Sequence, residues 1–375
     1  MESGATDIAH VEYVAQLARH LASVPHVHIP HPRRSAVAIV IRLINSAAYP
    51  PYPPSQTPEA TTQSLHEFLS NSVLASARAQ ILFIQRAQHD RDPWSGNIGF
   101  PGGKHELCDE SDQATAERET REELGLDLRE GYVHLGQLND VAVYLLGQGT
   151  RMAVSPHVYL QTQKQTPELR VSDEVASAHW IDFGCVLDRM DHPVRQFTAK
   201  YRSIGACIAA RLFPKQMHRW WFRLLSVCLG KLHYTVLPLP YTSEYSVTNK
   251  VFEAGTNSVR VSDHVRFASD TELYLWGISL CMVSELVDMS LPVAPQNVWS
   301  VASPWPQLGS WLWMDVNWMT NSVHRLTWTT HRRKPWTSQS DFFISYFRTL
   351  SIAFPVSCAA KLALAIYVGG FLFKI

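Results

Sequence analysis

The stretch from Gly102 to Leu126, GGKHELCDESDQATAERETREELGL, gathers three carboxylates on a segment that otherwise favours a helix. Because positions three and four apart on a helix share a face, Glu119, Glu122 and Glu123 are predicted to form one acidic cluster. Like charges at this spacing repel, so the pattern does not serve helix stability alone. Hard oxygen ligands on a rigid element suit Mg²⁺ or Mn²⁺, which keep water and substrate phosphates as their remaining ligands.

Glycines bracket this predicted helix. Gly125 is placed to end it, and the pair Gly102 and Gly103 lets the preceding backbone turn sharply and approach a ligand closely. The alternative is a solvated acidic helix face, which is the usual role of a charge run. We favour a functional cluster because the glycine turn, the Arg118-Glu119 pair and the ending Glu-Glu-Leu-Gly-Leu occur together.

This combination resembles the motif of the Nudix hydrolases, which runs Gly, five residues, Glu, seven residues, Arg-Glu, an aliphatic residue, any residue, Glu-Glu, any residue, Gly and an aliphatic residue. Two departures are evident: the spacing from Gly103 to Arg118 is one residue longer, and Thr120 replaces the aliphatic residue. The longer spacing, and the run Phe-Pro-Gly-Gly-Lys at 100–104, resemble the coenzyme A pyrophosphatase branch. The Asp109-Glu110 pair occupies the region of the motif's first Glu, and either residue can take its role.

The resemblance implies metal-dependent cleavage of a diphosphate linkage in a nucleoside diphosphate derivative, with coenzyme A derivatives as the first candidates. It implies that Glu122 and Glu123 ligate Mg²⁺ or Mn²⁺. Glu119 would be a further ligand or the base that takes a proton from water, and the carbonyl of Gly102 an additional ligand. The catalytic set also includes Arg118, which is expected to orient Glu119 or to pair with the Asp109-Glu110 region.

Three further positions are candidates for substrate contact. Lys104 can touch a substrate phosphate next to the close backbone approach at Gly103, and Trp94 can stack on a base. The alternatives are a solvated lysine and a tryptophan that packs on the core. Ser95 stands where the coenzyme A branch has a typical His, which leaves the identity of the substrate open.

The fold implied by the resemblance is α/β, with a mixed β-sheet between α-helices. We expect an N-terminal helical region at 1–30, a Nudix domain over 31–290 with insertions near 49–75 and 193–258, and a tail at 291–375. Alternating and apolar runs predict strands, and helical spacing predicts helices. The strands are predicted at 35–43, 79–86, 98–100, 132–138, 152–161 and 174–182, and the helices at 7–23, 183–190 and 272–289; 49–63 is predicted to be a loop.

Composition narrows the partners and the compartment. Lys plus Arg equals Asp plus Glu at 33 each, so no global field favours nucleic acid, and no nucleic-acid partner is expected. The 6 cysteines form no Cys-x-x-Cys pair, which indicates neither zinc nor disulfides and favours a reducing, intracellular compartment. The N-terminus lacks the pattern of a secretory signal.

The last part of the chain is rich in Trp, and 350–373 carries one charged side chain, Lys361. A membrane helix needs about 20 apolar residues, and a central Lys costs about 3 kcal/mol. The segment is therefore a candidate membrane anchor, with a buried or poorly ordered tail as the alternative. Without an anchor, the cytoplasm, mitochondrion or peroxisome is expected. Rival functions are a catalytically silent Nudix-like module that binds nucleotide or RNA, and a membrane-tethered scaffold; the oligomeric state stays open.

Overall fold

The computed structural model describes residues 10–44, 50, 52, 58–88, 96–145, 149–191, 196–197, 232–240, 246–248, 272–291, 307–308 and some positions between 316 and 367. The chain divides into two units, Met1–Val141, Met152–Arg195 and Thr235–Pro304 in the first, and Ala142–Arg151, Gln196–Tyr234 and Trp305–Ile375 in the second. Its elements in chain order are α1 His10–Ser23, β1 Arg34–Ile44, α2 Pro58–Leu69, the 3-10 turn Ser72–Leu74, β2 Arg78–Arg86, β3 Ile98–Gly99, β4 Gly102–Lys104, α3 Asp112–Leu124, β5 Tyr132–Gln137, β6 Val141–Leu145, β7 Gly149–Gln161, β8 Val175–Asp182, α4 Phe183–Asp191, β9 Gln196–Phe197, β10 Leu232–Pro240, β11 Ser246–Thr248, β12 Glu272–Trp276, α8 Gly277–Ser290 and β13 Gln307–Leu308.

The main sheet is mixed, as the sequence predicts. Its strand order is β11-β8-β2-β1-β7-β5, and β3, β4 and β6 pair with β2, β1 and β7. The strand β1 runs parallel to β7 and antiparallel to both β2 and β4. A second pairing joins residues 236–240 of β10 antiparallel to β12, within the first unit.

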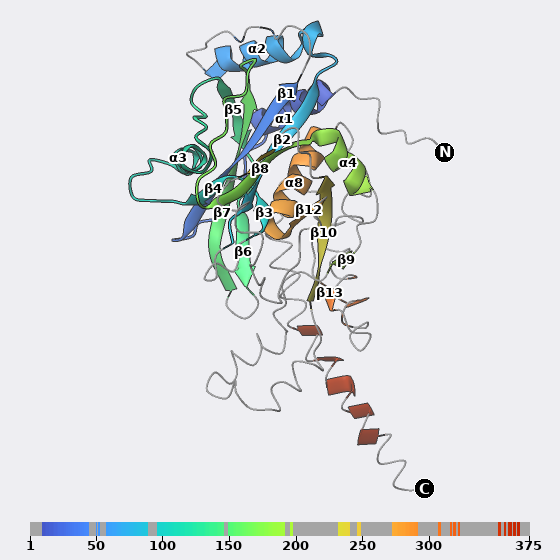
Figure 1. Ribbon diagram of the computed structural model, residues 1–375. Helices are drawn as coiled ribbons and strands as arrows, with labels where there is room; N and C mark the ends of the chain where they lie inside the picture. The colour runs from blue at the N-terminus through green and yellow to red at the C-terminus, as the bar shows by residue number, and fades with distance from the viewer. Residues whose placement is uncertain are drawn as a thin grey trace, which may run out of the picture. The chain divides into compact units, whose positions relative to one another are not determined.

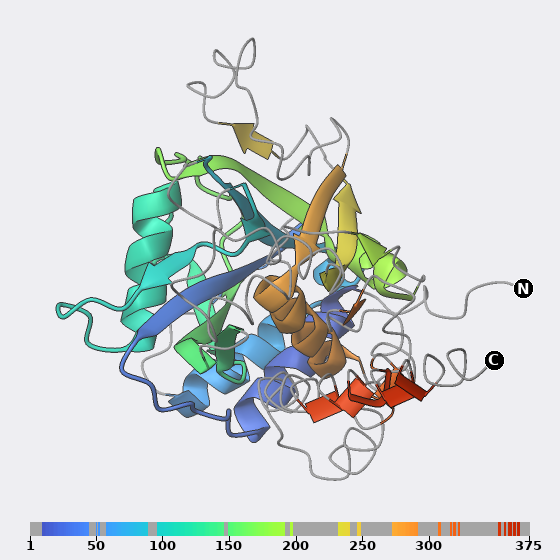
Figure 2. The same ribbon diagram turned by 90° about the horizontal axis from the view of Figure 1, so that it is seen from below.

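Helices of the first unit cover both faces of this sheet (Figures 1 and 2). The helix α3 lies over β1 and β4 on one face, whereas α1 and α8 pack together on the other. The chain therefore has a layered α/β architecture, with the helix that carries the acidic cluster packed directly on the central strands.

Small side chains let α3 approach the sheet closely. Ala36 and Ala38 of β1 and Ala116 of α3 are fully buried in the core between them, which also contains Leu82 and Trp180. Only a narrow stripe of α3 therefore contacts the sheet. Most of the helix surface is then free for the charged residues that the sequence places there.

An ion-pair cluster connects the start of α3 to β1 and to the loop between β5 and β6. Asp112, in the first turn of α3, accepts a hydrogen bond from Nε of Arg34 at 2.8 Å. Arg34 also donates to Asp140 at 2.9 Å, and the Asp140 side chain is fully buried. Asp140 in turn accepts the backbone N–H of Ile29 at 2.8 Å. This cluster fixes where α3 begins relative to the sheet.

Most predicted elements are confirmed. The predicted strands at 35–43, 79–86, 98–100, 132–138, 152–161 and 174–182 correspond to β1, β2, β3, β5, β7 and β8, and the helices at 7–23 and 183–190 to α1 and α4. Two predictions are wrong in part. The predicted loop at 49–63 contains the start of α2 at Pro58, and the first five residues of the predicted helix at 272–289 form β12 before α8 begins.

Several expectations lie outside the described residues, including those for Trp94 and most of the insertion at 193–258. Only scattered positions between 352 and 367 are described in the C-terminal segment. Within the part of the chain that the structure describes, no helix combines the length and hydropathy needed to cross a membrane.

Candidate active site

The helix α3 has well-formed ends that the local sequence explains. Ser111 caps its start by accepting the N–H of Ala114 at 3.1 Å, and Gly125 ends it in the left-handed region at φ 67°. Thr120, which departs from the aliphatic residue of the motif, is fully buried and donates to the carbonyl of Ala116 at 2.7 Å. Its hydroxyl is therefore satisfied within the helix, and its methyl group can pack on the core.

The glycine turn lies against β1 and α3. Gly102 has φ 150°, and a Cβ there would overlap the carbonyl oxygen of Ala36 and the backbone of Val37. A Cβ on Gly103 would instead overlap the carboxyl group of Glu119. The two glycines thus allow two close approaches, one of backbone to backbone and one of backbone to a carboxylate.

Glu123 is the most buried carboxylate of the predicted cluster, with 3% of the residue exposed. Its Oε2 accepts the N–H of Gly102 at 2.9 Å. The pKa of Glu123 is raised to about 8, chiefly by burial and also by the neighbouring carboxylates of Glu119 and Glu174, while the hydrogen bond from Gly102 and the charge of Arg86 oppose the shift. The protein therefore holds a carboxyl group where its negative charge is poorly compensated.

Glu119 lies one helical turn before Glu123 and shares its electrostatic environment. Burial raises the pKa of Glu119 above its ordinary value, although Arg118 opposes the shift. Nη2 of Arg118 lies 3.1 Å from Oε1 of Glu119. The close approach to Gly103 and this ion pair together orient the Glu119 carboxylate.

Glu122 has a different position. Its side chain is 56% exposed, and its Oε2 accepts a hydrogen bond from Nη1 of Arg118 at 2.9 Å. The structure thus sets the exposed Glu122 apart from the buried Glu119 and Glu123. Among the described residues, no group of three or more His, Cys, Asp or Glu side chains has an arrangement that could hold a metal ion. The predicted ligand set of Glu119, Glu122, Glu123 and the Gly102 carbonyl therefore stays a prediction.

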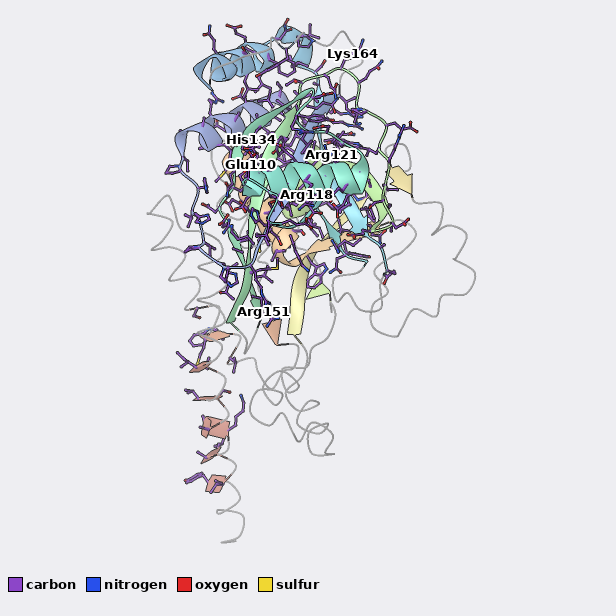
Figure 3. The ribbon with its side chains drawn as sticks, turned by 90° about the vertical axis from the view of Figure 1, so that its left-hand side faces the viewer. Glu110, Arg118, Arg121, His134, Arg151 and Lys164 are labelled. Carbon is purple, nitrogen blue, oxygen red and sulfur yellow. The ribbon has the colours of Figure 1, made fainter. Side chains whose placement is uncertain are left out.

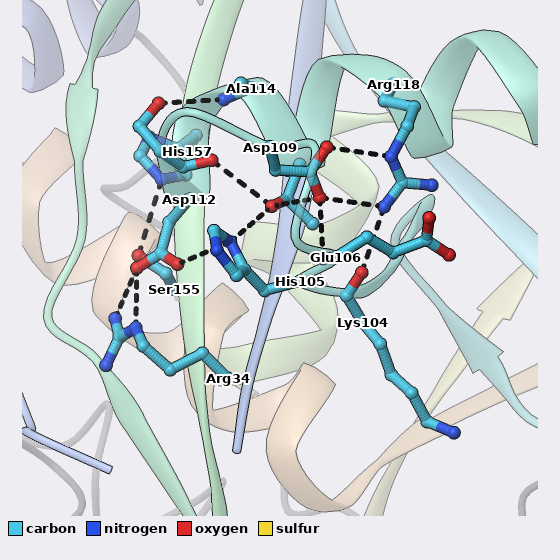
Figure 4. A network of polar contacts seen from close by, with 12 residues as sticks. Arg34, Lys104, His105, Glu106, Asp109, Asp112, Ala114, Arg118, Ser155 and His157 are labelled. Atoms are coloured by element: carbon cyan, nitrogen blue, oxygen red, sulfur yellow. Dashed lines mark hydrogen bonds and ion pairs between the residues drawn. The ribbon is translucent and has the colours of Figure 1, made fainter. Parts of the chain in front are cut away.

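Asp109, and not Glu110, forms the predicted pair with Arg118 (Figure 4). Its side chain is 4% exposed and makes two hydrogen bonds with Arg118, from Nε at 2.9 Å and from Nη2 at 3.0 Å. This pairing holds the pKa of Asp109 well below its usual range and that of Arg118 above it. Glu110 is exposed (Figure 3).

Arg118 therefore connects the loop before α3 to the carboxylates on it. Besides Asp109, it donates to the carbonyl of Lys104 at 3.0 Å and contacts both Glu119 and Glu122. This geometry supports an orienting role for the guanidinium group. Lys104 itself is exposed beside the glycine turn.

Two charged residues near Glu123 were missed from the sequence. Glu174 raises the pKa of both Glu119 and Glu123, and Arg86 lowers that of Glu123. The loop before β8 is fastened to the end of α3, because Ser172 N–H donates to the carbonyl of Glu123 at 2.9 Å. No local motif marks either residue, because the contact joins segments far apart in the chain.

The two glycines should differ when replaced by alanine. Gly102→Ala is expected to lower the free energy of unfolding by roughly 2 kcal/mol or more, because the new Cβ meets backbone at an unfavourable φ. Gly103→Ala should cost less than about 1 kcal/mol, because the Glu119 side chain can move away. Urea unfolding of both variants measures the difference, and equal losses would contradict the assigned packing.

Glu123 should make stability depend on pH. In the folded protein the pKa of Glu123, about 8, lies above the ordinary value of a glutamate carboxyl group. The folded state therefore binds the proton more tightly, and this contribution to stability is lost as pH rises through about 8. Glu123→Gln keeps the Gly102 hydrogen bond without the charge, so its free energy of unfolding relative to wild type should rise by up to about 1.4 kcal/mol per pH unit.

The free energy of unfolding of the wild type and of Glu123→Gln is measured by urea unfolding between about pH 5 and pH 8, in the presence of a metal chelator. A difference that stays constant across this range would show that Glu123 is not held protonated by burial.

Comparison with known proteins gives a family match within this region. Residues 71–201 match the family model described as the NUDIX domain. An uncharacterized protein of Schizosaccharomyces pombe is 30% identical over 224 residues, which cover 58% of this chain and 59% of that protein. The aligned region thus spans less than two thirds of the length of this curated relative.

Several solved structures are also similar to parts of this chain. The NUDIX domain of Shewanella oneidensis NrtR, in complex with ADP ribose, is 16% identical, with a TM-score of 0.26 over 46% of this chain and 86% of that chain. An Ap4A hydrolase of C. elegans is 13% identical, with a TM-score of 0.26 over 43% of this chain and 87% of that chain. Residues 71–201 therefore match a NUDIX domain in sequence, and the mixed sheet and the helix after the glycine turn lie largely within this region.

Proposed function

We propose that the chain is a Nudix-type pyrophosphohydrolase that cleaves a diphosphate linkage in a nucleoside diphosphate derivative. The observation that carries the proposal is the buried carboxyl group of Glu123, next to Glu119 on α3 and hydrogen-bonded to Gly102. The match of residues 71–201 to the NUDIX domain supports the same activity. A buried cluster of carboxylates with raised pKa values is typical of a functional site.

The donor chemistry fits Mg²⁺ or Mn²⁺. Glu119, Glu123 and Glu174 repel one another in a partly buried environment, and a hard cation would relieve this repulsion. Glu119 and Glu123 would hold the cation, with Glu122 and the Gly102 carbonyl as the further ligands. When bound, such an ion neutralises phosphate charge and lowers the pKa of a coordinated water.

Individual residues of the chain have separate roles in the proposed hydrolysis. Glu174 is the candidate base for the attacking water when Glu119 serves as a ligand, and Glu119 is the base when it does not; both carboxylates lie near Glu123. Arg118 orients Glu119 through their 3.1 Å contact. Lys104 contributes positive charge for a substrate phosphate beside the close backbone approach at Gly103.

The substrate proposed first is coenzyme A or one of its derivatives, because the run at 100–104 and the longer motif resemble that branch. The rival function is a silent module that binds nucleotide or RNA. We favour the enzyme because Arg118, Glu119, Glu122 and Glu123 are all present, whereas a silent module has no need of the complete set.

The test is product release from a substrate panel with Mg²⁺ or Mn²⁺. The panel contains coenzyme A, ADP ribose, Ap4A and a nucleoside triphosphate. Glu123→Gln and Glu119→Gln should each lower turnover at least about 100-fold, because they remove a ligand or a base. Glu130→Gln, at an exposed position, is the matched control and should keep wild-type turnover. Full activity in Glu123→Gln would exclude its proposed role, and an inactive wild type that still binds nucleotide would favour the silent module.

A separate proposal concerns localisation: we propose that the protein is intracellular and that its C-terminal segment contacts a membrane surface. Support comes from large apolar side chains exposed at described positions of this segment, among them Ile352, Ile366 and Tyr367. Such side chains favour contact with lipid or with a partner protein.

Fractionation of cells that express the full chain, or a chain without residues 340–375, tests this proposal. Loss of the membrane fraction on truncation is expected. An unchanged distribution would remove the membrane role and leave a cytoplasmic, mitochondrial or peroxisomal enzyme.

A further inference from the structure

His105 and Thr115 form a short hydrogen-bonded chain that ends at Asp109 (Figure 4). Nδ1 of His105 lies 2.9 Å from Oγ1 of Thr115, and that oxygen lies 2.9 Å from Oδ2 of Asp109. Thr115 is fully buried in the first turn of α3, whereas His105 is partly exposed in the loop after the glycine turn. Thr115 therefore contacts Asp109, the partner of Arg118, and His105 contacts Thr115; neither residue belongs to the predicted site.

The direction of these hydrogen bonds follows from the chemistry of Asp109. Its carboxylate can only accept, and it does so from Arg118, from the N–H of Glu106 at 2.9 Å and from Thr115. The single hydroxyl proton of Thr115 has two acceptors in reach, Asp109 and the carbonyl of Ser111 at 3.2 Å. The Asp109 carboxylate is the strongest acceptor in reach of this proton. With the hydroxyl donating to Asp109, Thr115 Oγ1 accepts from Nδ1–H of His105, which selects the Nδ1–H tautomer of the ring.

The ion-pair cluster at the start of α3 lies beside the same nitrogen of His105. Oδ1 of Asp112 lies 3.6 Å from Nδ1 of His105, and Oδ2 of Asp112 is held by Arg34 at 2.8 Å. The negative charge of Asp112 favours a proton on Nδ1, which is hydrogen-bonded to Thr115. The polar chain thus extends from Arg34 on β1 to Asp109.

We propose that His105 and Thr115 are positioning residues for the carboxylates of α3, an inference that rests on the proposed hydrolase function. The Thr115 hydroxyl fixes the plane of the Asp109 carboxylate, which receives two hydrogen bonds from Arg118. Arg118 then lies 3.1 Å from Glu119 and 2.9 Å from Glu122. Loss of the Nδ1–H or of the hydroxyl would let Arg118 shift, and Glu119 would shift with it.

Paired variants separate this role from packing. Thr115→Val keeps the shape and removes the hydroxyl, whereas Thr115→Ser keeps it. His105→Ala removes the donor, whereas the amide of His105→Asn can replace Nδ1–H. Thr115→Val and His105→Ala should lower kcat roughly 10-fold with KM nearly unchanged, as expected when a charge-assisted network is broken away from the substrate. Thr115→Ser and His105→Asn should recover most of the rate.

An equal loss in His105→Asn and His105→Ala, or a change confined to KM, would overturn the positioning role. Because His105 is partly exposed, its variants are expected to fold even if Thr115→Val does not. Urea unfolding of each variant identifies any loss of rate that comes from instability.

The tautomer of His105 gives a readout that does not depend on activity. Long-range ¹H–¹⁵N spectra at about pH 8, where a free imidazole is neutral, should show His105 protonated on Nδ1. The signal is assigned by its loss in His105→Asn, and the preference for Nδ1–H should weaken in Thr115→Val. Protonation on Nε2 in the wild type would overturn the proposal. A wild type that is inactive on every substrate would instead exclude the proposed function. The tautomer measurement would then still test the hydrogen bond from His105 to Thr115.

Discussion

The burial of a carboxyl group against a glycine N–H is the constraint on which the rest of this site depends. Glu123 lies on the sheet side of α3, where water cannot solvate its charge, and Gly102 supplies a compensating hydrogen bond at 2.9 Å. Both partners are fixed by backbone packing, Gly102 by its pairing with β1 and Glu123 by the small side chains beneath α3. A group held in this way favours a ligand that can replace the lost solvation, and a hard divalent cation does so.

Around this buried group, the polar contacts of the loop before α3 fix the orientation of Arg118 and of the carboxylates on α3. Asp109 receives hydrogen bonds from Arg118, Thr115 and the backbone, and Arg118 contacts Glu119 and Glu122. The fixed orientation of these charges before substrate binds is what electrostatic catalysis requires, because no reorganisation is then needed during the reaction. The network also explains why the loop can be one residue longer than the general motif: Asp109 still reaches Arg118.

Much of the fold could be predicted from sequence because its signals are local. The end of α3 follows from Gly125, and the strands follow from their alternating and apolar runs. The segment at 272–276 was misread because ELYLW fits both a strand and the first turn of an apolar helix. The helix α2 was missed because the prolines before it suggested a loop, although Pro58 is placed at its first turn, where proline is favoured.

The sequence predicted the site residues on α3 but not the residues of other segments that lie around them. Glu119 and Glu123 are recognisable from their spacing, but the different exposure of Glu122 depends on how α3 is rotated on the sheet. The choice of Asp109 over Glu110 depends on the path of the loop, and the approach of Glu174 depends on contacts between distant segments. These features depend on the tertiary structure, so no local pattern in the sequence predicts them.

The most direct test of the central claim is a calorimetric titration of the protein with Mn²⁺ at pH 7, in two buffers of different ionisation enthalpy. Because burial raises the pKa of Glu123 to about 8, the account predicts that Mn²⁺ binding releases a proton from this residue. The release should be close to one proton per bound ion and should be absent in Glu123→Gln, with weaker binding. Tight binding without proton release, or equal affinity in the variant, would contradict the claim that this buried carboxylate holds the metal ion.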